Sequence, residues 1–303
     1  MMASTSVART VALALTLLIP VAIAAEPAGP AAAPPPAEQQ TPAVKPEPAP
    51  PKLEQKALDI LKSACDKLAA AKTMSFDAFI EEEGPDLNYG LPLEFSRTAA
   101  VVLERPDKLL VKGHGAGPTT EFYYDGKTMT AWMPQENLVA TAPAPSTIDA
   151  MLKAAYDKAA IYFPFTDVIV AHPYDDLLDG LKVAFYIGRS DVVAGTTTDM
   201  IALGNDDVFM QAWIGTKDKL PYRLRAVFLG DPLSLRHDLV LSNWKLDAPV
   251  AAGTFVAKIP ADAGKIPFQH PAEMLPTAPP PKAETPETKP GASESKAPAK
   301  EGQ

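Results

Sequence analysis

The chain has 303 residues, with 28 Lys and Arg against 37 Asp and Glu, a formal net charge of -9 and a pI near 5.0. Because phosphate contacts need clustered basic side chains, this balance argues against a nucleic-acid partner and against an anionic membrane surface. The single cysteine excludes an intramolecular disulfide and a cysteine-rich zinc site.

The first 24 residues have the pattern of a secretory signal peptide. Arg9 supplies a positive charge, residues 11–19 are apolar, and residues 22–24 fit the small-x-small rule for cleavage. The apolar run is shorter than the roughly 20 residues of a membrane-spanning helix. We therefore expect a periplasmic protein that is cleaved near Ala24, and a retained N-terminal anchor is the alternative.

Two Pro-rich segments flank the rest of the chain. Residues 25–52 are rich in Pro and Ala, and residues 271–303 are rich in Pro, Lys and Glu. Neither composition can bury a core, so we expect a disordered linker and a disordered tail. These two segments could act as a tether within the envelope or as solubilising tails, and both roles are open. The folded part is expected at residues 53–270, one domain by its length.

The folded part begins with a helical pattern and continues with strands. Residues 53–71 carry apolar side chains at helical spacing, and Cys65 lies beside that apolar stripe as a small apolar filler. The Asp125-Gly126 pair predicts a hairpin with a type I′ turn. A period of two predicts the first group of strands at 74–80, 93–103, 109–113, 121–124, 128–132 and 138–141.

A group of short helical segments then interrupts the strands. Residues 145–159 combine a capping Ser-Thr start with an apolar face, and residues 163–180 continue the group. The pattern predicts an α+β fold in which a large curved antiparallel sheet of ten or eleven strands, an incomplete β-barrel, holds helices in its concave face. The later strands are expected at 182–187, 196–203, 208–214, 222–229, 235–246 and, last and short, 255–260.

The sequence contains no motif of catalysis or of cofactor binding. There is no Gly-x-Ser-x-Gly, no Walker loop and no Gly-x-Gly-x-x-Gly after a strand. The glycine-rich run 113–117 precedes strands, so it is interpreted as a hairpin loop. No cofactor and no metal are expected, because no His-x-His or His-x-x-x-His pair occurs among His114, His172, His237 and His270.

Acidic residues come in short runs at 81–83, 175–179 and 206–207. Each run is interpreted as a solvated charged loop, since each falls at an expected strand end or turn. A hydrolase with an unusual site at Asp206 and Asp207 is the enzymatic alternative.

The remaining signal is apolar and aromatic. A curved sheet capped by helices can enclose a cavity, and small-molecule pockets have such linings. Packing within a filled core is an equally open role for each of these side chains. The candidate cavity residues are Phe76, Phe122, Tyr124, Trp132, Met151, Met210, Trp213, Phe228 and Trp244.

Several segments resemble, in order and spacing, the domain of unknown function 2092 family of predicted periplasmic proteins. That family is similar to the lipoprotein-carrier group of LolA, LolB and LppX types. The resemblance implies an incomplete barrel around an apolar cavity, and transport of lipids or acylated lipoproteins without chemistry. The segments are 122–130 (FYYDGKTMT), 141–149 (TAPAPSTID), 211–214 (QAWI), 220–224 (LPYRL), 243–246 (NWKL) and 255–264 (FVAKIPADAG).

The carriers of that group use an arginine of the barrel that contacts the lid helices. Arg97, Arg223 and Arg225 all fall on expected strands, and none of them alone matches that role. The sequence thus predicts a non-catalytic monomer that binds a hydrophobic small molecule, a lipid or a lipoprotein acyl chain, with an envelope protein as a further partner. The alternative is a protein-interaction or envelope-sensing module with a filled core.

Overall fold

The computed structural model describes residues 53–86, 89–193 and 195–270. The expected signal peptide, the linker before residue 53 and the tail after residue 270 lie outside these residues. Within the described ranges, the helices are all too short or too polar to cross a membrane.

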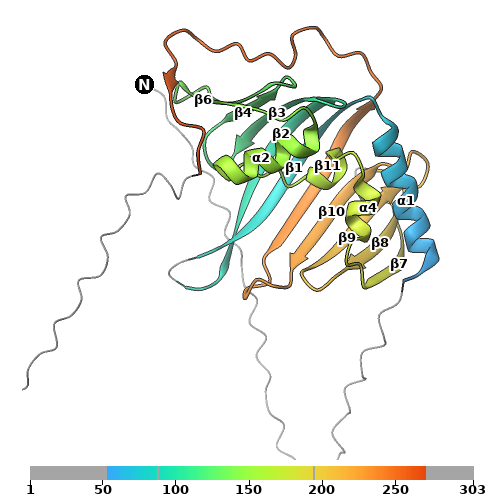
Figure 1. The fold of residues 1–303 in the computed structure, drawn as a ribbon. Helices are drawn as coiled ribbons and strands as arrows, with labels where there is room; N and C mark the ends of the chain where they lie inside the picture. The colour runs from blue at the N-terminus through green and yellow to red at the C-terminus, as the bar shows by residue number, and fades with distance from the viewer. Residues whose placement is uncertain (1–52, 87–88, 194, 271–303) are drawn as a thin grey trace, which may run out of the picture. The chain divides into compact units, whose positions relative to one another are not determined.

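Twelve strands form one open sheet in the order β12-β6-β5-β4-β3-β2-β1-β11-β10-β9-β8-β7 (Figure 1). All neighbours are antiparallel except β12, which is parallel to β6. The expected curved antiparallel sheet is confirmed, and the additional strand is the two-residue β12. The strands are β1 (Thr73–Pro85), β2 (Pro92–Glu104), β3 (Lys108–Gly115), β4 (Thr120–Tyr124), β5 (Thr128–Met133), β6 (Leu138–Pro143), β7 (Val183–Ser190), β8 (Thr198–Gly204), β9 (Val208–Gly215), β10 (Pro221–Phe228), β11 (Arg236–Leu246) and β12 (Gly264–Lys265).

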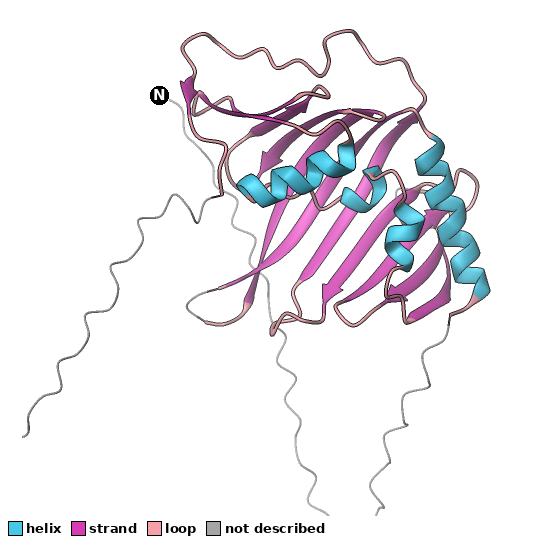
Figure 2. Ribbon diagram, viewed as in Figure 1, coloured by secondary structure: helices cyan, strands magenta, loops and turns pink. Residues whose placement is uncertain are grey.

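Four helices lie on one side of this sheet, which curves around them (Figure 2). They are α1 (Gln55–Ala70), α2 (Ile148–Ala159), α3 (Thr166–Ile169) and α4 (Pro173–Leu178). The α1 helix packs on β7, β8 and β9, and it buries Cys65 with the rest of its apolar stripe, as expected. The hydroxyl of Thr147 accepts a hydrogen bond from the Ala150 N–H and so caps α2.

The hairpin between β4 and β5 is confirmed, but its turn is not of type I′. A type I′ turn needs a positive φ at both central residues, and here only Gly126 has one, at 93°. The Asp125 carboxylate instead accepts hydrogen bonds from the backbone N–H groups of Lys127 and Thr128. The turn is therefore stabilised by the Asp125 side chain, and not by the positive φ that was expected at residue 125.

The expected strand at 255–260 is wrong. This stretch crosses the outer face of the sheet, where Phe255 packs against Leu110 of β3 and Tyr123 of β4. Because β3 and β4 already have strand partners on both sides, no backbone groups are available there for a further strand. The aromatic anchor, and not strand pairing, fixes this segment.

One edge of the sheet is covered by the residues just before α1. Leu53 forms a parallel bridge with Ala184 of β7, and the Glu54 N–H donates a 2.8 Å hydrogen bond to the Ala184 carbonyl. The Glu54 carboxylate accepts a 3.1 Å hydrogen bond from the Tyr186 N–H. Two residues thus satisfy backbone groups of the edge strand that no other strand reaches.

The opposite edge is covered by β12 and the residues after it. The Gly264 N–H donates to the Asn137 carbonyl over 2.8 Å, and the Ile266 N–H donates to the Val139 carbonyl over 2.9 Å. The chain thereby passes from the outer face, around β6, to the concave side. The segment that follows, Ile266 to Gln269, borders a cavity and is called the strap below.

Candidate functional site

A cavity of about 480 Å³ lies between strands β1 to β6 and residues 159–165, which link α2 to α3 and are called the roof segment below. This volume falls within the roughly 300–1,000 Å³ of small-molecule pockets, and most of the lining is apolar. The sheet contributes Ile80, Ala99, Val111, Phe122, Ala131 and Ala140 to the lining.

The cavity exists because small side chains meet in register on the concave face. Phe122 of β4 pairs with Ala131 of β5, and Ala131 pairs with Ala140 of β6. The roof segment begins with Ala159 and Ala160, which are equally small. Since a methyl group from either side cannot bridge the gap between sheet and roof, apolar space remains where larger residues would have closed the core.

The roof segment is held by aromatic contacts. The Phe163 ring meets Phe122 edge-on with centroids 5.3 Å apart, and it stacks on Phe165 at 5.7 Å. Phe165 in turn meets Phe76 of β1 edge-on at 5.6 Å. These contacts join the roof to the closed part of the core, so the cavity wall is built from both layers.

The strap forms a further part of the cavity wall. Its residues Ile266, Pro267, Phe268 and Gln269 all line the cavity, and Phe268 packs against the main core. The two-residue β12 and the 2.9 Å hydrogen bond from Ile266 tie this segment to β6. The sequence analysis did not include these residues, because it assigned them to the end of the folded part.

A second recess, of about 610 Å³, adjoins the first and is charged. Arg97 of β2 forms an ion pair with Glu82 of β1, and the His237 Nδ1 lies 3.9 Å from a Glu82 carboxylate oxygen. Burial lowers the pKa of His237, Arg97 lowers it further, and Glu82 opposes both. The expected solvated loop at residues 81–83 is therefore wrong, because β1 continues through them to Pro85.

A third recess, of about 230 Å³, lies over the other half of the sheet. Leu224, Met210 and Phe228 form part of its apolar floor, while Asp167 and Asp176 come from the helical side. Burial raises the pKa of the Asp167 carboxyl, and the charge of Asp176 raises it further. This recess is below the usual volume of a small-molecule pocket.

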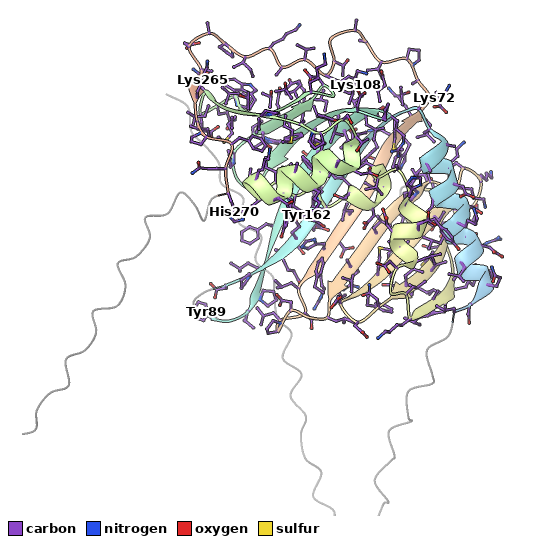
Figure 3. The ribbon with its side chains drawn as sticks, in the orientation of Figure 1. Lys72, Tyr89, Lys108, Tyr162, Lys265 and His270 are labelled. Atoms are coloured by element: carbon purple, nitrogen blue, oxygen red, sulfur yellow. The ribbon has the colours of Figure 1, made fainter. Side chains whose placement is uncertain are left out.

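Tyr162 lines all three recesses. Figure 3 shows this side chain beside α2, on the concave side of the sheet. Burial raises the pKa of its phenol to about 12, and the charges of Asp167 and Glu82 contribute. Tyr162 stays a neutral hydroxyl at physiological pH and separates the apolar cavity from the charged recess.

Four of the nine candidate cavity residues line one of these recesses. Phe122 and Trp132 border the 480 Å³ cavity, and Met210 and Phe228 border the 230 Å³ recess. Three others lie in the closed core and border none of the three recesses, namely Phe76, Tyr124 and Met151.

The two remaining tryptophans lie elsewhere. Trp244 packs against Phe76, with ring centroids 4.5 Å apart, and its indole N–H donates to the Pro221 carbonyl. Trp213 follows Ala212, which faces the core, so strand alternation places Trp213 on the outer face. There the Arg223 guanidinium lies 5.1 Å from its ring.

Arg105, which was not among the arginines expected from the sequence, forms a hydrogen bond to the helical layer. Arg105 lies in the turn between β2 and β3, and its Nη2 donates a 2.9 Å hydrogen bond to the Val170 carbonyl after α3. By contrast, Arg223 and Arg225 both face Asp238 on the outer side of the sheet. Arg105 was missed because it precedes Pro106 in an apparent turn.

The described residues offer little for metal or acid–base chemistry. Among them, no three His, Cys, Asp or Glu side chains gather in a way that could hold a metal ion. Asp206 and Asp207 lie in the turn between β8 and β9, where Asp206 pairs with Lys182. The Asn205 side chain accepts from the backbone N–H groups of Asp207 and Val208, which is an ordinary turn.

Comparisons with known proteins identify the family. The chain resembles the Mycobacterium tuberculosis lipoprotein LppX (15% identity, 66% of this chain and 99% of that one, TM-score 0.42). It also resembles a LolA superfamily protein of Nitrosomonas europaea (12%, 66% and 97%, TM-score 0.32) and Pseudomonas aeruginosa MucB in its MucA complex (13%, 67% and 61%, TM-score 0.38). These values are too low to support a functional conclusion.

No curated protein matches the sequence. The sequence profile of the DUF2092 family, described as a predicted periplasmic protein, matches residues 57–269. This match covers the strands, the roof segment and the strap. The chain therefore belongs to the DUF2092 family of predicted periplasmic proteins.

Proposed function

We propose that this protein is a non-catalytic periplasmic binding protein or carrier that holds a hydrophobic ligand, a lipid or the acyl chain of a lipoprotein. The observation that carries the proposal is the largely apolar 480 Å³ cavity between the sheet and the roof segment, bordered by the strap. Export with cleavage near Ala24 belongs to the same proposal and rests on the signal-peptide pattern.

The lining favours an apolar ligand over a polar one. Each Å² of apolar surface that leaves water contributes about 25 cal/mol, so an acyl chain gains affinity from contact alone. The ion pair of Arg97 and Glu82 lies just beyond Tyr162, where it can meet the polar end of such a ligand. The ligand is held mainly by its chain, because the charges near the cavity are already paired with each other.

The direct test is native mass spectrometry of the exported chain purified from a bacterial periplasm, followed by extraction with organic solvent. We expect a bound species that the extraction identifies as a lipid or an acylated peptide. A protein that carries no lipid and also fails to bind the neutral fluorescent probe N-phenylnaphthylamine would overturn the proposal.

A cavity-filling variant locates the site. Ala131→Phe projects a ring into the cavity, so we expect at least tenfold weaker binding of N-phenylnaphthylamine. Thr130→Phe is the matched control. Thr130 is the neighbour of Ala131 in β5, but it faces the outer side of the sheet, where it pairs with Tyr123. Equal binding by both variants would place the probe outside this cavity.

The second candidate function is a protein-interaction or envelope-sensing module. It is favoured by the closed core beside the cavity, where Phe76, Tyr124 and Met151 are each at most 2% exposed. In that case the flanking Pro-rich segments would capture an envelope partner. A chain without residues 271–303 should then lose the cross-linked partner that the full chain retains, whereas an unchanged cross-linking pattern would argue against the module.

A further inference from the structure

The concave face of β2 carries exposed apolar side chains that lead from solvent to the charged recess, which adjoins the cavity. Within β2, Leu93 and Phe95 point to this face and are each 48% exposed, and Leu91, just before the strand, is 65% exposed. Arg97 follows in the charged recess, and Ala99, only 5% exposed, lines the 480 Å³ cavity. One strand therefore connects the end of the β1–β2 hairpin with the candidate ligand site.

Further exposed apolar side chains lie on the β1–β2 hairpin and on the turn beside it. Tyr89 is 84% exposed, and Figure 3 shows it at the end of the hairpin that lies away from the helices. The neighbouring β10–β11 turn adds exposed Leu229 and Leu233. Isolated exposed apolar side chains are normal on a protein surface, but a run on one protruding hairpin that leads to an apolar cavity indicates an interaction site.

The charges around the hairpin limit the kind of surface that it can meet. No Lys or Arg occurs from residue 81 to residue 96, although Arg97 and Arg236 pair with Glu82 and Glu83. An anionic surface would be repelled, whereas zwitterionic headgroups would not. The acidic residues of this stretch are Glu81, Glu82, Glu83, Asp86 and Glu94.

We infer that the exposed side chains of Tyr89, Leu91, Leu93 and Phe95 on the β1–β2 hairpin dock on a neutral, zwitterionic lipid surface, and that the last three guide the apolar chain of a ligand between that surface and the cavity. This inference rests on the proposed function. Side chains of Leu, Tyr and Phe on a protruding hairpin can enter the headgroup region of a lipid layer. These apolar side chains lead to a charged recess beside an apolar cavity, an arrangement that fits the chain and headgroup of a lipid better than the pocket of a protein partner.

Flotation of the full chain with phosphatidylcholine vesicles tests the inference. We expect the wild-type protein to float with the vesicles and the L91E/L93E variant to lose at least tenfold in bound fraction. The matched control is V192E/V256E, which introduces the same two charges at valines that are 83% and 59% exposed elsewhere. This control should float like the wild type.

The outcomes separate this inference from the proposed function. Binding of N-phenylnaphthylamine in solution should be unchanged in L91E/L93E, which shows that the variant is folded and that its cavity works. A wild-type chain that binds the probe but does not float would overturn the docking inference alone, as would equal flotation of both variants. Flotation that increases with added phosphatidylglycerol would also overturn it, because the acidic hairpin would then not govern the contact.

Discussion

The Nη2 of Arg105 donates a 2.9 Å hydrogen bond to the Val170 carbonyl and so ties the β2–β3 turn to the chain after α3. The Asp149 carboxylate of α2 accepts from the Ala171 N–H next to it. Three segments that are distant in sequence therefore meet at one point, and this point holds the helical layer over the sheet.

Replacing Arg105 by Ala should loosen that layer. A hydrogen bond from a charged donor contributes about 1.5–3 kcal/mol, so we expect the free energy of unfolding to fall by about that amount. Urea denaturation measures it. Lys153→Ala is the control, because it pairs with Asp157 where both side chains are exposed, at 76% and 52%, so its loss should cost less. Equal losses of stability in both variants would contradict the role of Arg105 in holding the helical layer over the sheet.

Replacing Phe268 by Ala should open the cavity at the strap. The side chain lines the cavity and packs on the core, so its loss removes part of the wall that retains a bound ligand. We expect dissociation of N-phenylnaphthylamine to become about tenfold faster, equivalent to about 1.4 kcal/mol. Stopped-flow fluorescence measures this rate. Phe255→Ala, on the outer face, should lower stability but leave the dissociation rate of the probe unchanged. If the probe also dissociated about tenfold faster from Phe255→Ala, the effect of Phe268→Ala would not be specific to the strap.

The stability of the protein should depend on His237 near neutral pH. Burial lowers the pKa of this imidazole in the folded chain, so the unfolded chain binds the proton more readily. The contribution of His237 to stability is therefore present above the unfolded pKa and is lost as the pH falls below it. Glu82, Glu83 and Arg97 face the ring and set how far the shift goes. Urea unfolding at pH 7.5 and 5.5 should show a smaller difference for His237→Gln than for the wild type.

The Cys65 thiol should be unreactive towards thiol reagents in the folded protein. Burial raises the pKa of its thiol to about 12, and the nearby Asp66 adds to the shift, so almost no thiolate exists at pH 8. Ellman's reagent should label it only in denaturant. Cys65→Ser should cost about 1–3 kcal/mol through a buried hydroxyl, more than Cys65→Ala. Rapid labelling of the native chain would show that α1 detaches from the sheet.

Local patterns in the sequence predict those parts of the fold that local forces determine. The apolar spacing in 53–71 predicts α1 almost to its ends, and Asp125-Gly126 marks the β4–β5 hairpin. Each of these elements depends on residues within a few positions of one another, so the local sequence is enough to predict it.

The charged recess could not be predicted in this way. Glu82 meets His237 because β1 pairs with β11, two strands far apart in sequence, and this pairing depends on the topology of the whole sheet. Strand faces are equally hard to assign where the register shifts. The positive φ of Asn243, 54°, accompanies such a shift between β1 and β11, and strict alternation along β11 fails there.

The coverage of both sheet edges has a consequence for the protein at high concentration. An uncovered edge strand offers unpaired N–H and C=O groups on which another copy can grow a sheet. Here Leu53 and Glu54 occupy the β7 edge, and Gly264 and Ile266 occupy the β6 edge. The sheet can thus stay open around a cavity while these residues keep part of each edge from pairing with another copy.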